Sequence, residues 1–216
     1  VGFPVVSITG PRQSGKTTLA QHVFSDKTYV TLEDPDIREQ ALDDPRGFLA
    51  QFPDGAVLDE VQRCPDLFSY IQGIVDKDGR MGLFILTGSQ QFGLRAGISQ
   101  SLAGRVGSLE LLPLSLGELK SAGRLSDDLD TLLFTGGYPP IYNRPVETSQ
   151  WQAAYISTYL ERDVRQLINV KDIALFQRFL RICAHHVGQL VNLTQIANDC
   201  GITHKTAESW LSVLES

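Results

Sequence analysis

Short apolar runs alternate with helical patterns from the start of the chain to about Leu112. The apolar runs are candidate strands at Pro4 to Thr9, Tyr29 to Leu32, Ala56 to Leu58, Leu83 to Thr87 and Ser108 to Leu112. The stretches between them carry signals for the start of a helix, such as Pro35 directly after Asp34. This alternation predicts an α/β fold in which helices cover a five-stranded, mainly parallel sheet in three layers.

The pattern changes at Ser115, after which almost every periodic segment is helical. Ser115 followed by Glu118 is typical of a capping box, in which each side chain accepts a hydrogen bond from the backbone N–H of the other residue. Long helical patterns run from about Ser149 to Val170 and from Ile173 to Val187. The stiff turn Gly136-Gly137-Tyr138-Pro139-Pro140 interrupts the helical part. We therefore predict a core with the start of a helical lid over residues 1–137, and a helical domain, truncated at its end, over residues 138–216.

The composition is that of an ordinary, mildly acidic globular protein: 42% of the 216 residues are hydrophobic, 20% are charged and the net charge is -6. This balance does not favour nucleic acid as a partner. Cys64, Cys183 and Cys200 lack Cys-x-x-Cys spacing, so we expect neither a disulfide framework nor a zinc ribbon, and a reducing cytoplasm as the setting. No apolar run approaches the roughly 18 to 20 residues that span a bilayer, so we expect no membrane segment.

A glycine-rich loop follows the first candidate strand. It reads Gly10-Pro11-Arg12-Gln13-Ser14-Gly15-Lys16-Thr17, with Thr18 next, and we assign all of these residues to nucleotide binding. The loop fits G-x-x-x-x-G-K-[ST], whose backbone N–H groups converge on phosphate oxygens. Lys16 is expected to reach the β- and γ-phosphates, and the Thr17 hydroxyl to bind Mg²⁺. Apolar residues lie before the loop and, at helical spacing, after it, as phosphate binding requires. The alternative is a glycine-rich turn that only caps a helix.

An acidic pair, Asp59 and Glu60, ends the third candidate strand. Carboxylates at the end of a parallel strand meet a phosphate loop at the same edge of the sheet. Asp59 is expected to hold the Mg²⁺ shell, and Glu60 to orient and deprotonate the water that attacks the γ-phosphate. The alternative is that the two carboxylates are only solvated loop charges, as an isolated acidic pair often is. The phosphate loop upstream makes this alternative weaker. The chain shows neither the Asn-Lys-x-Asp segment of a GTPase nor the arginine-rich lid of a small-molecule kinase.

Further candidates complete the catalytic set. Ser89, just after the fourth strand, and Thr87 are candidates to sense the γ-phosphate or to hold the water, with local turn hydrogen bonds as the alternative. Arg105 precedes the fifth strand and is a candidate to bring positive charge to the γ-phosphate, in its own chain or in a neighbouring subunit. Its rivals are Arg95, Arg162 and Arg165, and a surface ion pair is the alternative for each. Within the loop, we expect the Arg12 side chain to pair with a carboxylate.

The segment from Thr194 to Thr206 has helix-turn-helix spacing, with a turn at Gly201 and a second helix capped by Thr203. From Val191 onward, Lys205 alone stands against Asp199, Glu208 and Glu215. Contacts with DNA phosphates need Lys and Arg. We therefore interpret the segment as a packing or protein-interaction module, with DNA contact as the lesser alternative.

Taken together, these residues resemble the prokaryotic AAA-type ATPases that carry an ATPase core followed by a domain of unknown function. The resemblance rests on the phosphate loop and on Leu58-Asp59-Glu60-Val61-Gln62, Leu86-Thr87-Gly88-Ser89, Ala103-Gly104-Arg105, Leu112-Pro113-Leu114-Ser115, Gly136-Gly137-Tyr138-Pro139 and Tyr159-Leu160-Glu161-Arg162-Asp163. It covers nearly the whole chain. It implies a P-loop NTPase sheet in which the Ser89 strand lies between the phosphate-loop strand and the Asp59 strand, followed by a helical lid and a winged-helix-like domain. Members of the family usually have an additional segment before the first strand and a sizeable domain after the helix-turn-helix.

The leading hypothesis is Mg²⁺-dependent binding and hydrolysis of ATP, with the nucleotide state moving the helical part as a switch or motor. The alternative is an ATP-gated adaptor or regulator with little hydrolysis, associated with DNA in one version. The expected cofactors are ATP and Mg²⁺. The expected partners are an unidentified protein and, if an arginine acts in trans, further copies of the chain.

Overall fold

The computed structural model describes residues 2–88, 101–159 and 173–214. Its contacts divide the chain into two units, Val1–Pro145 and Val146–Ser216. The division falls later in the chain than the predicted boundary after residue 137, so the turn from Gly136 to Pro140 belongs to the first unit. Within the described residues, no helix is both long enough and apolar enough to cross a membrane.

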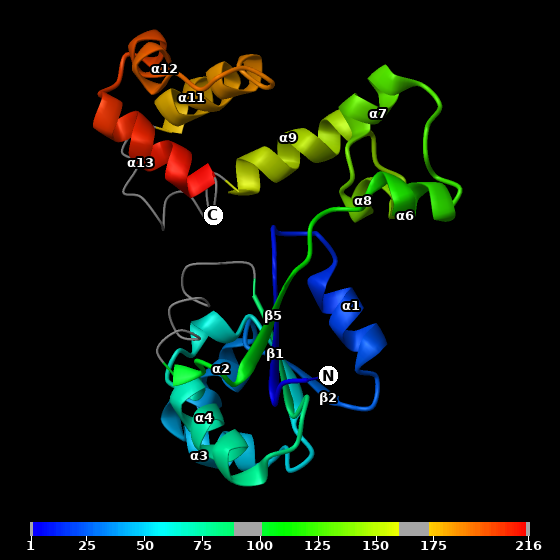
Figure 1. The fold of residues 1–216 in the computed structure, drawn as a ribbon, viewed down its shortest axis with the longest axis vertical. Helices are drawn as coiled ribbons and strands as arrows, with labels where there is room; N and C mark the ends of the chain where they lie inside the picture. The colour runs from blue at the N-terminus through cyan, green and yellow to red at the C-terminus, as the bar shows by residue number, and fades with distance from the viewer. Residues whose placement is uncertain (1, 89–100, 160–172, 215–216) are drawn as a thin grey trace. The chain divides into compact units, whose positions relative to one another are not determined.

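A five-stranded sheet forms the centre of the first unit (Figure 1). Its strand order is β2-β3-β4-β1-β5. The strands are β1 (Val5–Thr9), β2 (Thr28–Thr31), β3 (Ala56–Asp59), β4 (Phe84–Thr87) and β5 (Val106–Glu110). Every pairing among them is parallel, so all five strands end at the same edge. The strand before Ser89, β4, lies between β1 and β3, which confirms the strand order implied by the resemblance.

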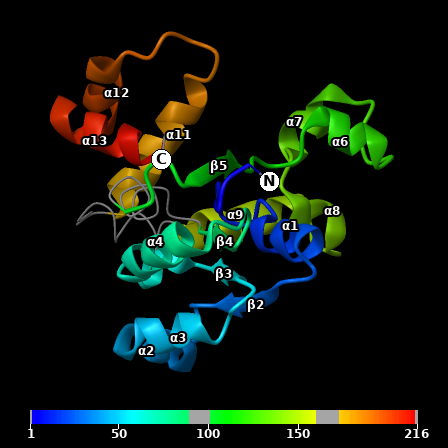
Figure 2. The same cartoon turned by 60° about the horizontal axis from the view of Figure 1, so that its bottom comes forward.

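Helices cover both faces of this sheet. They are α1 (Lys16–Val23), α2 (Pro35–Asp43), α3 (Pro45–Ala50) and α4 (Leu67–Asp78). Successive residues of a strand point to opposite faces, so Val5 packs with α2, α3 and α4, whereas Val6 packs with α1. Figure 2 shows α4 and α1 on opposite sides of the strands. Because both faces are covered, β1, β3 and β4 are buried along their whole length, and the predicted three-layer α/β core is confirmed.

Three short helices follow β5 in the first unit, namely α6 (Leu116–Ser121), α7 (Leu129–Thr135) and α8 (Pro139–Asn143). The predicted capping box begins α6, because the Ser115 hydroxyl accepts a hydrogen bond from the Glu118 N–H and the Glu118 carboxylate accepts one from the Ser115 N–H. The Asp128 carboxylate caps α7 by accepting a hydrogen bond of 2.8 Å from a backbone N–H of its first turn. Pro139 begins α8, since the fixed φ of proline suits the first helical position.

The second unit contains α9 (Thr148–Tyr159), α11 (Ile173–His185), α12 (Leu193–Cys200) and α13 (His204–Leu214). In its core, Phe176 and Phe179 of α11 pack edge-on against Trp210 of α13, with ring centroids 5.1 and 5.5 Å apart. Gly201 turns the chain between α12 and α13 with a φ of 75°, and the Thr203 hydroxyl caps α13. The predicted helix-turn-helix is therefore present. The described part of this unit holds no strand, so the winged-helix assignment stays a prediction.

Candidate nucleotide-binding site

The phosphate loop joins the carboxyl end of β1 to the first turn of α1. Gly10 has a φ of 140°, and a Cβ atom there would lie 2.1 Å from the carbonyl oxygen of Leu111, so only glycine fits at this crossing. Gly15 has a φ of 99° and precedes α1 in the left-handed conformation. Glycines in such conformations allow backbone N–H groups to converge in front of a helix. The loop thus has the form that holds an anion at a helix N-terminus.

Two polar side chains of the loop are buried, with 6% of Lys16 and 4% of Ser14 exposed. The Lys16 ammonium donates to the carbonyls of Gly10 at 3.0 Å and Pro11 at 2.7 Å. Burial lowers the pKa of Lys16, and the nearby carboxylates of Glu60 and Asp59 oppose that shift. The buried Ser14 hydroxyl has no hydrogen-bond partner among the residues that the structure describes. A phosphate oxygen in the loop would satisfy it.

The Asp59 carboxylate, 7% exposed, lies at the end of β3 and accepts hydrogen bonds from three hydroxyl groups. Thr17 of α1 donates to Oδ2 at 3.0 Å, and Tyr29 of β2 donates to the same oxygen at 2.7 Å. Thr87 of β4 donates to Oδ1. The phosphate loop, the edge strand and the neighbouring central strand therefore all meet at this one carboxylate.

Glu60 follows directly at the same edge of the sheet. Its backbone has a φ of 56° and a ψ of 39°, a left-handed conformation that is uncommon for residues other than glycine and that concentrates at functional sites. The Gln62 amide donates to Glu60 Oε2 at 2.5 Å. Among the charges near Lys16, Glu60 raises the pKa of that ammonium most. The structure therefore brings Lys16, Asp59 and Glu60 together.

The oxygen atoms around Asp59 suit Mg²⁺, which binds carboxylate, hydroxyl and phosphate oxygens and usually keeps part of its water shell. The Thr17 hydroxyl oxygen lies 3.0 Å from Asp59 Oδ2. These two oxygens are therefore close enough to bind one ion, directly or through its water. In the described ranges, no three His, Cys, Asp or Glu side chains come together to hold a metal ion by themselves.

Arg105 does not join this cluster. Val106, the first residue of β5, pairs with Val5, the first residue of β1, so Arg105 lies at the amino edge of the sheet and the phosphate loop lies at the carboxyl edge. The Arg105 guanidinium forms an ion pair with Asp76 of α4, which raises the pKa of Arg105 and lowers that of Asp76. A role for Arg105 at the phosphates of its own chain does not fit this geometry, and a role in a neighbouring chain stays a prediction.

The remaining predicted residues are placed as follows. Ser89 lies outside the described residues, as do Arg95, Arg162 and Arg165. In the loop and at the start of α1, Gln13 and Thr18 are exposed, whereas Pro11 and Arg12 are half-buried.

Sequence reasoning missed two residues that contact the acidic pair, Tyr29 and Gln62. The Tyr29 contact joins two strands, and no local pattern indicates which strands are neighbours. Gln62 was noticed only as part of a sequence resemblance, without a role. Its position two residues after Glu60 is a signal that could have been used, because a side chain at that spacing after a sharp turn can fold back on the carboxylate.

The segment from Gly136 to Pro140 was also missed as part of the site. A Cβ atom on Gly15 would lie 3.9 Å from Pro139, so this segment packs beside the phosphate loop. The Leu114 N–H donates to the Gly137 carbonyl at 2.7 Å, and a Cβ atom on Gly137 would lie 2.3 Å from the Leu114 carbonyl oxygen. The turn that sequence reasoning treated as a domain boundary therefore forms a wall beside the loop.

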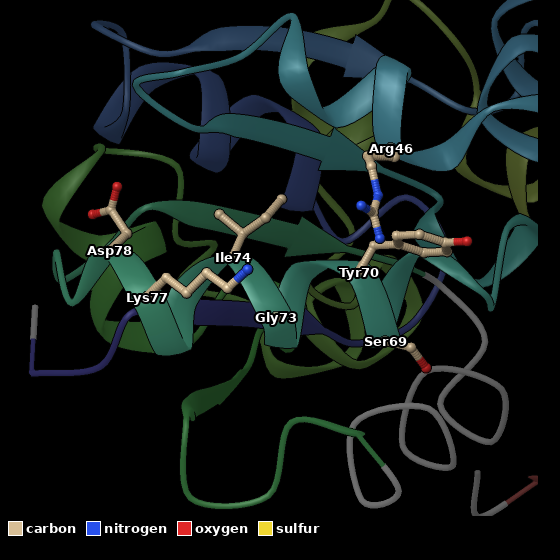
Figure 3. A pocket seen from close by; sticks show the side chains of 7 residues that line it. All are labelled: Arg46, Ser69, Tyr70, Gly73, Ile74, Lys77 and Asp78. Carbon is tan, nitrogen blue, oxygen red and sulfur yellow. The ribbon is translucent and has the colours of Figure 1, made fainter.

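A separate hollow of about 690 Å³ lies on the outer side of α4 (Figure 3). The Arg46 guanidinium of α3 lies 6.0 Å from the centre of the Tyr70 ring there. The described residues that line this hollow include none from the phosphate loop or the acidic pair. Its position therefore does not alter the assignment of the nucleotide site to the carboxyl edge of the sheet.

A phosphate loop after β1, an acidic pair after β3 and β4 between these strands define the class of this protein: it has the P-loop NTPase fold. Residues 2–120 match the model of the family described as AAA domain, and residues 126–216 match a domain of unknown function, DUF8612. The chain belongs to the AAA domain family.

Two curated relatives extend this comparison. An uncharacterised protein of Mycobacterium tuberculosis and one of Mycobacterium bovis are each 34% identical to the chain over 215 residues. Each alignment covers 98% of this chain and 47% of the relative. The chain therefore spans about half the length of these relatives.

Solved structures of low similarity include the RuvB Holliday junction branch migration motor of Thermotoga maritima, with a TM-score of 0.44 and 20% identity over 96% of this chain and 79% of that one. The replication initiator DnaA bound to AMPPCP and single-stranded DNA has a TM-score of 0.41 and 14% identity, over 98% of this chain and 82% of that one. A likeness this loose transfers no function to the chain.

Proposed function

We propose that the protein binds ATP together with Mg²⁺ and hydrolyses the bond to the γ-phosphate. The observation that carries this proposal is the convergence of Lys16, Thr17 and Asp59, with Glu60 beside them, at one edge of the sheet. The Ser14 hydroxyl, buried in the loop and without a hydrogen-bond partner in the described part of the chain, supports an anionic ligand there. Membership in the AAA domain family supports a nucleotide as that ligand.

Nucleotide binding would use groups that are already in place. Lys16 would exchange its hydrogen bonds to the carbonyls of Gly10 and Pro11 for phosphate oxygens, which provide the buried ammonium with an anionic partner. The N–H groups of the loop and the N-terminus of α1 would hold the β-phosphate. Thr17 and Asp59 would hold Mg²⁺, which neutralises phosphate charge when bound.

Hydrolysis would need Glu60. A water oxygen attacks the γ-phosphorus, the bond from that phosphorus to the bridging oxygen of ADP breaks, and Glu60 accepts the proton of the water. Glu60 lies at the correct edge of the sheet, but its Oε2 accepts a hydrogen bond from Gln62. Release of that bond would remove one group that competes with the water for this carboxylate.

Single-turnover hydrolysis of ATP with Mg²⁺ tests this assignment. We expect Glu60→Gln to bind ATP within about threefold of wild type, since the amide keeps the shape, but to hydrolyse it at least about 10²-fold more slowly. Glu39→Gln on the exposed face of α2 is the matched control and should hydrolyse ATP like wild type. Equal rates for Glu60→Gln and wild type would refute the role of Glu60.

The Gln62 bond favours one alternative function, an ATP-gated adaptor or regulator with little hydrolysis. Gln62 occupies Oε2 of Glu60 and so competes with a water molecule for that oxygen. One outcome is that wild type and Gln62→Ala both bind ATP while neither hydrolyses it at any protein concentration. That result would favour the adaptor function over the ATPase function. Faster hydrolysis by Gln62→Ala than by wild type would instead show that the bond restrains an active ATPase.

The action of the whole protein is part of the same proposal. We infer a cytoplasmic switch or motor in which the nucleotide state moves the helical unit against an unidentified protein partner. Contact with DNA is the less favoured form of this proposal. Asp199 and Glu208 give the region around the helix-turn-helix more negative charge than Lys205 can offset, and DNA phosphates repel negative charge. Fluorescence anisotropy with duplex DNA, at low salt and with ATP, tests it. Absence of binding under those conditions would exclude the DNA version.

A further inference from the structure

Tyr29 reaches Asp59 from the edge strand β2. In the register of β2 and β3, Tyr29 pairs with Val57, and Thr31 is the residue directly opposite Asp59. The Thr31 hydroxyl accepts a hydrogen bond of 3.2 Å from the Glu33 N–H and so helps to turn the chain after β2. The long side chain of Tyr29 spans the diagonal to Asp59 instead, with its hydroxyl 2.7 Å from Oδ2.

The three hydroxyl donors to Asp59 differ in what nucleotide binding would do to them. Under the proposed function, the Thr17 hydroxyl turns to Mg²⁺ and leaves Oδ2. Tyr29 belongs to β2 and not to the phosphate loop, and it would keep its hydrogen bond to that oxygen. Thr87 holds the other oxygen, Oδ1. Because β3 lies between β2 and β4, Tyr29 and Thr87 hold the carboxylate from both neighbouring strands.

The Tyr29 hydroxyl is a phenol, which carries its proton at neutral pH and can donate to Asp59. A protonated phenol can only donate to a carboxylate, so the direction of this bond is set. Each carboxylate oxygen has a second lone pair, which remains for a magnesium ion or for its water.

The geometry points to Tyr29 as a positioning residue for Mg²⁺: its hydroxyl holds Asp59 in the orientation that receives the ion bound with ATP. This inference rests on the proposed function and deepens it, because Tyr29 belongs to neither the phosphate loop nor the acidic pair. Groups that orient a metal ligand from behind commonly change metal affinity when removed. Tyr29 therefore affects the affinity for Mg²⁺ and leaves the contacts between the loop and the nucleotide unchanged.

The test is a Mg²⁺ titration of the binding of a non-hydrolysable ATP analogue, so that turnover does not enter. For Tyr29→Phe we expect the Mg²⁺ concentration at half-maximal binding to rise about three- to tenfold, because Asp59 loses one donor. The affinity for the analogue in EDTA should stay within about twofold of wild type, since the loop is intact. Tyr70→Phe removes a phenol hydroxyl from the outer side of α4 (Figure 3) and should match wild type in both measurements.

Two further variants show whether Tyr29 acts through Asp59. The double variant Tyr29→Phe/Asp59→Asn should have the same Mg²⁺ dependence as Asp59→Asn alone, because residues that act through one contact are not additive. Site-specific 4-aminophenylalanine at position 29 keeps an N–H donor in the same place. It should return the Mg²⁺ midpoint to within about twofold of wild type. If Tyr29→Phe does not fold, this variant still tests whether a donor at position 29 sets the Mg²⁺ midpoint.

An unchanged Mg²⁺ midpoint in a folded Tyr29→Phe would overturn the inference. An equal loss of affinity with and without Mg²⁺ would also overturn it, because that result marks a structural role for Tyr29. If wild type itself does not bind the analogue, the proposed function fails and this inference fails with it. If wild type binds and only the Tyr29→Phe comparison fails, the inference alone is overturned.

Discussion

Lys16 shows at the scale of one residue how a binding site can oppose stability. Its ammonium is buried against two backbone carbonyls, and this burial lowers its pKa below the ordinary value of 10.5. The unfolded chain therefore holds the Lys16 proton more tightly than the folded chain does. The resulting cost to folding is fully present below the lowered pKa, and it fades as the pH rises through that pKa toward 10.5.

Urea unfolding of Lys16→Met without nucleotide tests this cost. Relative to wild type, we expect the variant to be more stable at about pH 7 than at about pH 10, because only wild type carries the buried charge. The loss of two hydrogen bonds to the loop carbonyls is the same at both pH values, so the difference between them isolates the charge. An identical stability difference at both pH values would contradict this account. With ATP and Mg²⁺ present, only wild type should gain stability.

At the scale of elements, the connection between α7 and α8 supports the phosphate loop. Gly137 lies so close to the backbone of Leu114 that no side chain fits, and Pro139 packs beside Gly15. The Gly10 backbone is equally close to Leu111, three residues before Leu114. The short segment after β5 therefore contacts both the loop and the Gly136 to Pro140 wall, and its packing depends on glycine at both crossings.

Gly137→Ala should destabilise the first unit by about 1–3 kcal/mol, because the added methyl group meets a backbone carbonyl that cannot turn away. Gly73→Ala is the matched control, since a Cβ atom there would meet nothing within 4 Å among the described residues, apart from its chain neighbours and the backbone of its own helix. In the interior of α4 it should stabilise by about 0.5–1 kcal/mol through helix propensity. Urea unfolding gives the free energy of unfolding of both variants. Equal values for the two would show that the Gly137 backbone does not pack closely against Leu114.

The elements themselves were well predicted from sequence. All five strands were expected within two residues of their observed ends, and Ser115 caps α6 as its spacing to Glu118 indicates. These features are local, because periodicity and capping depend on residues a few positions apart. The helix-turn-helix around Gly201 was found for the same reason. A contact such as that between Pro139 and Gly15 joins segments more than a hundred residues apart, and no local pattern predicts it.

At the scale of the whole molecule, Arg105 raises the question of assembly. It lies at the opposite edge of the sheet from the phosphate loop of its own chain, and it pairs with Asp76. A contribution of Arg105 to hydrolysis would therefore have to come from a second copy of the chain. An arginine supplied in this way can accelerate hydrolysis by about 10³-fold or more.

Mixing experiments test the assembly. We expect hydrolysis per chain to rise with protein concentration in wild type and to stay low in Arg105→Ala alone. A mixture of Arg105→Ala with Lys16→Met should recover part of the activity, because one chain supplies the loop and the other supplies the arginine. Arg80→Ala, which removes a surface arginine paired with Asp54 and Asp78, is the control and should behave like wild type. No recovery in the mixture, together with a rate independent of concentration, would exclude Arg105 in trans.

The sequence by itself determined the fold class of this protein and the pieces from which its site is built. The phosphate loop and the acidic pair are short motifs at the ends of strands, and hydrophobic alternation shows where those strands lie. Only the tertiary structure decided that Tyr29 reaches Asp59, that Pro139 lies beside Gly15 and that Arg105 lies at the far edge. The physical reason is that each of these facts depends on which segments are neighbours in the folded unit, and that follows from the packing of the whole core.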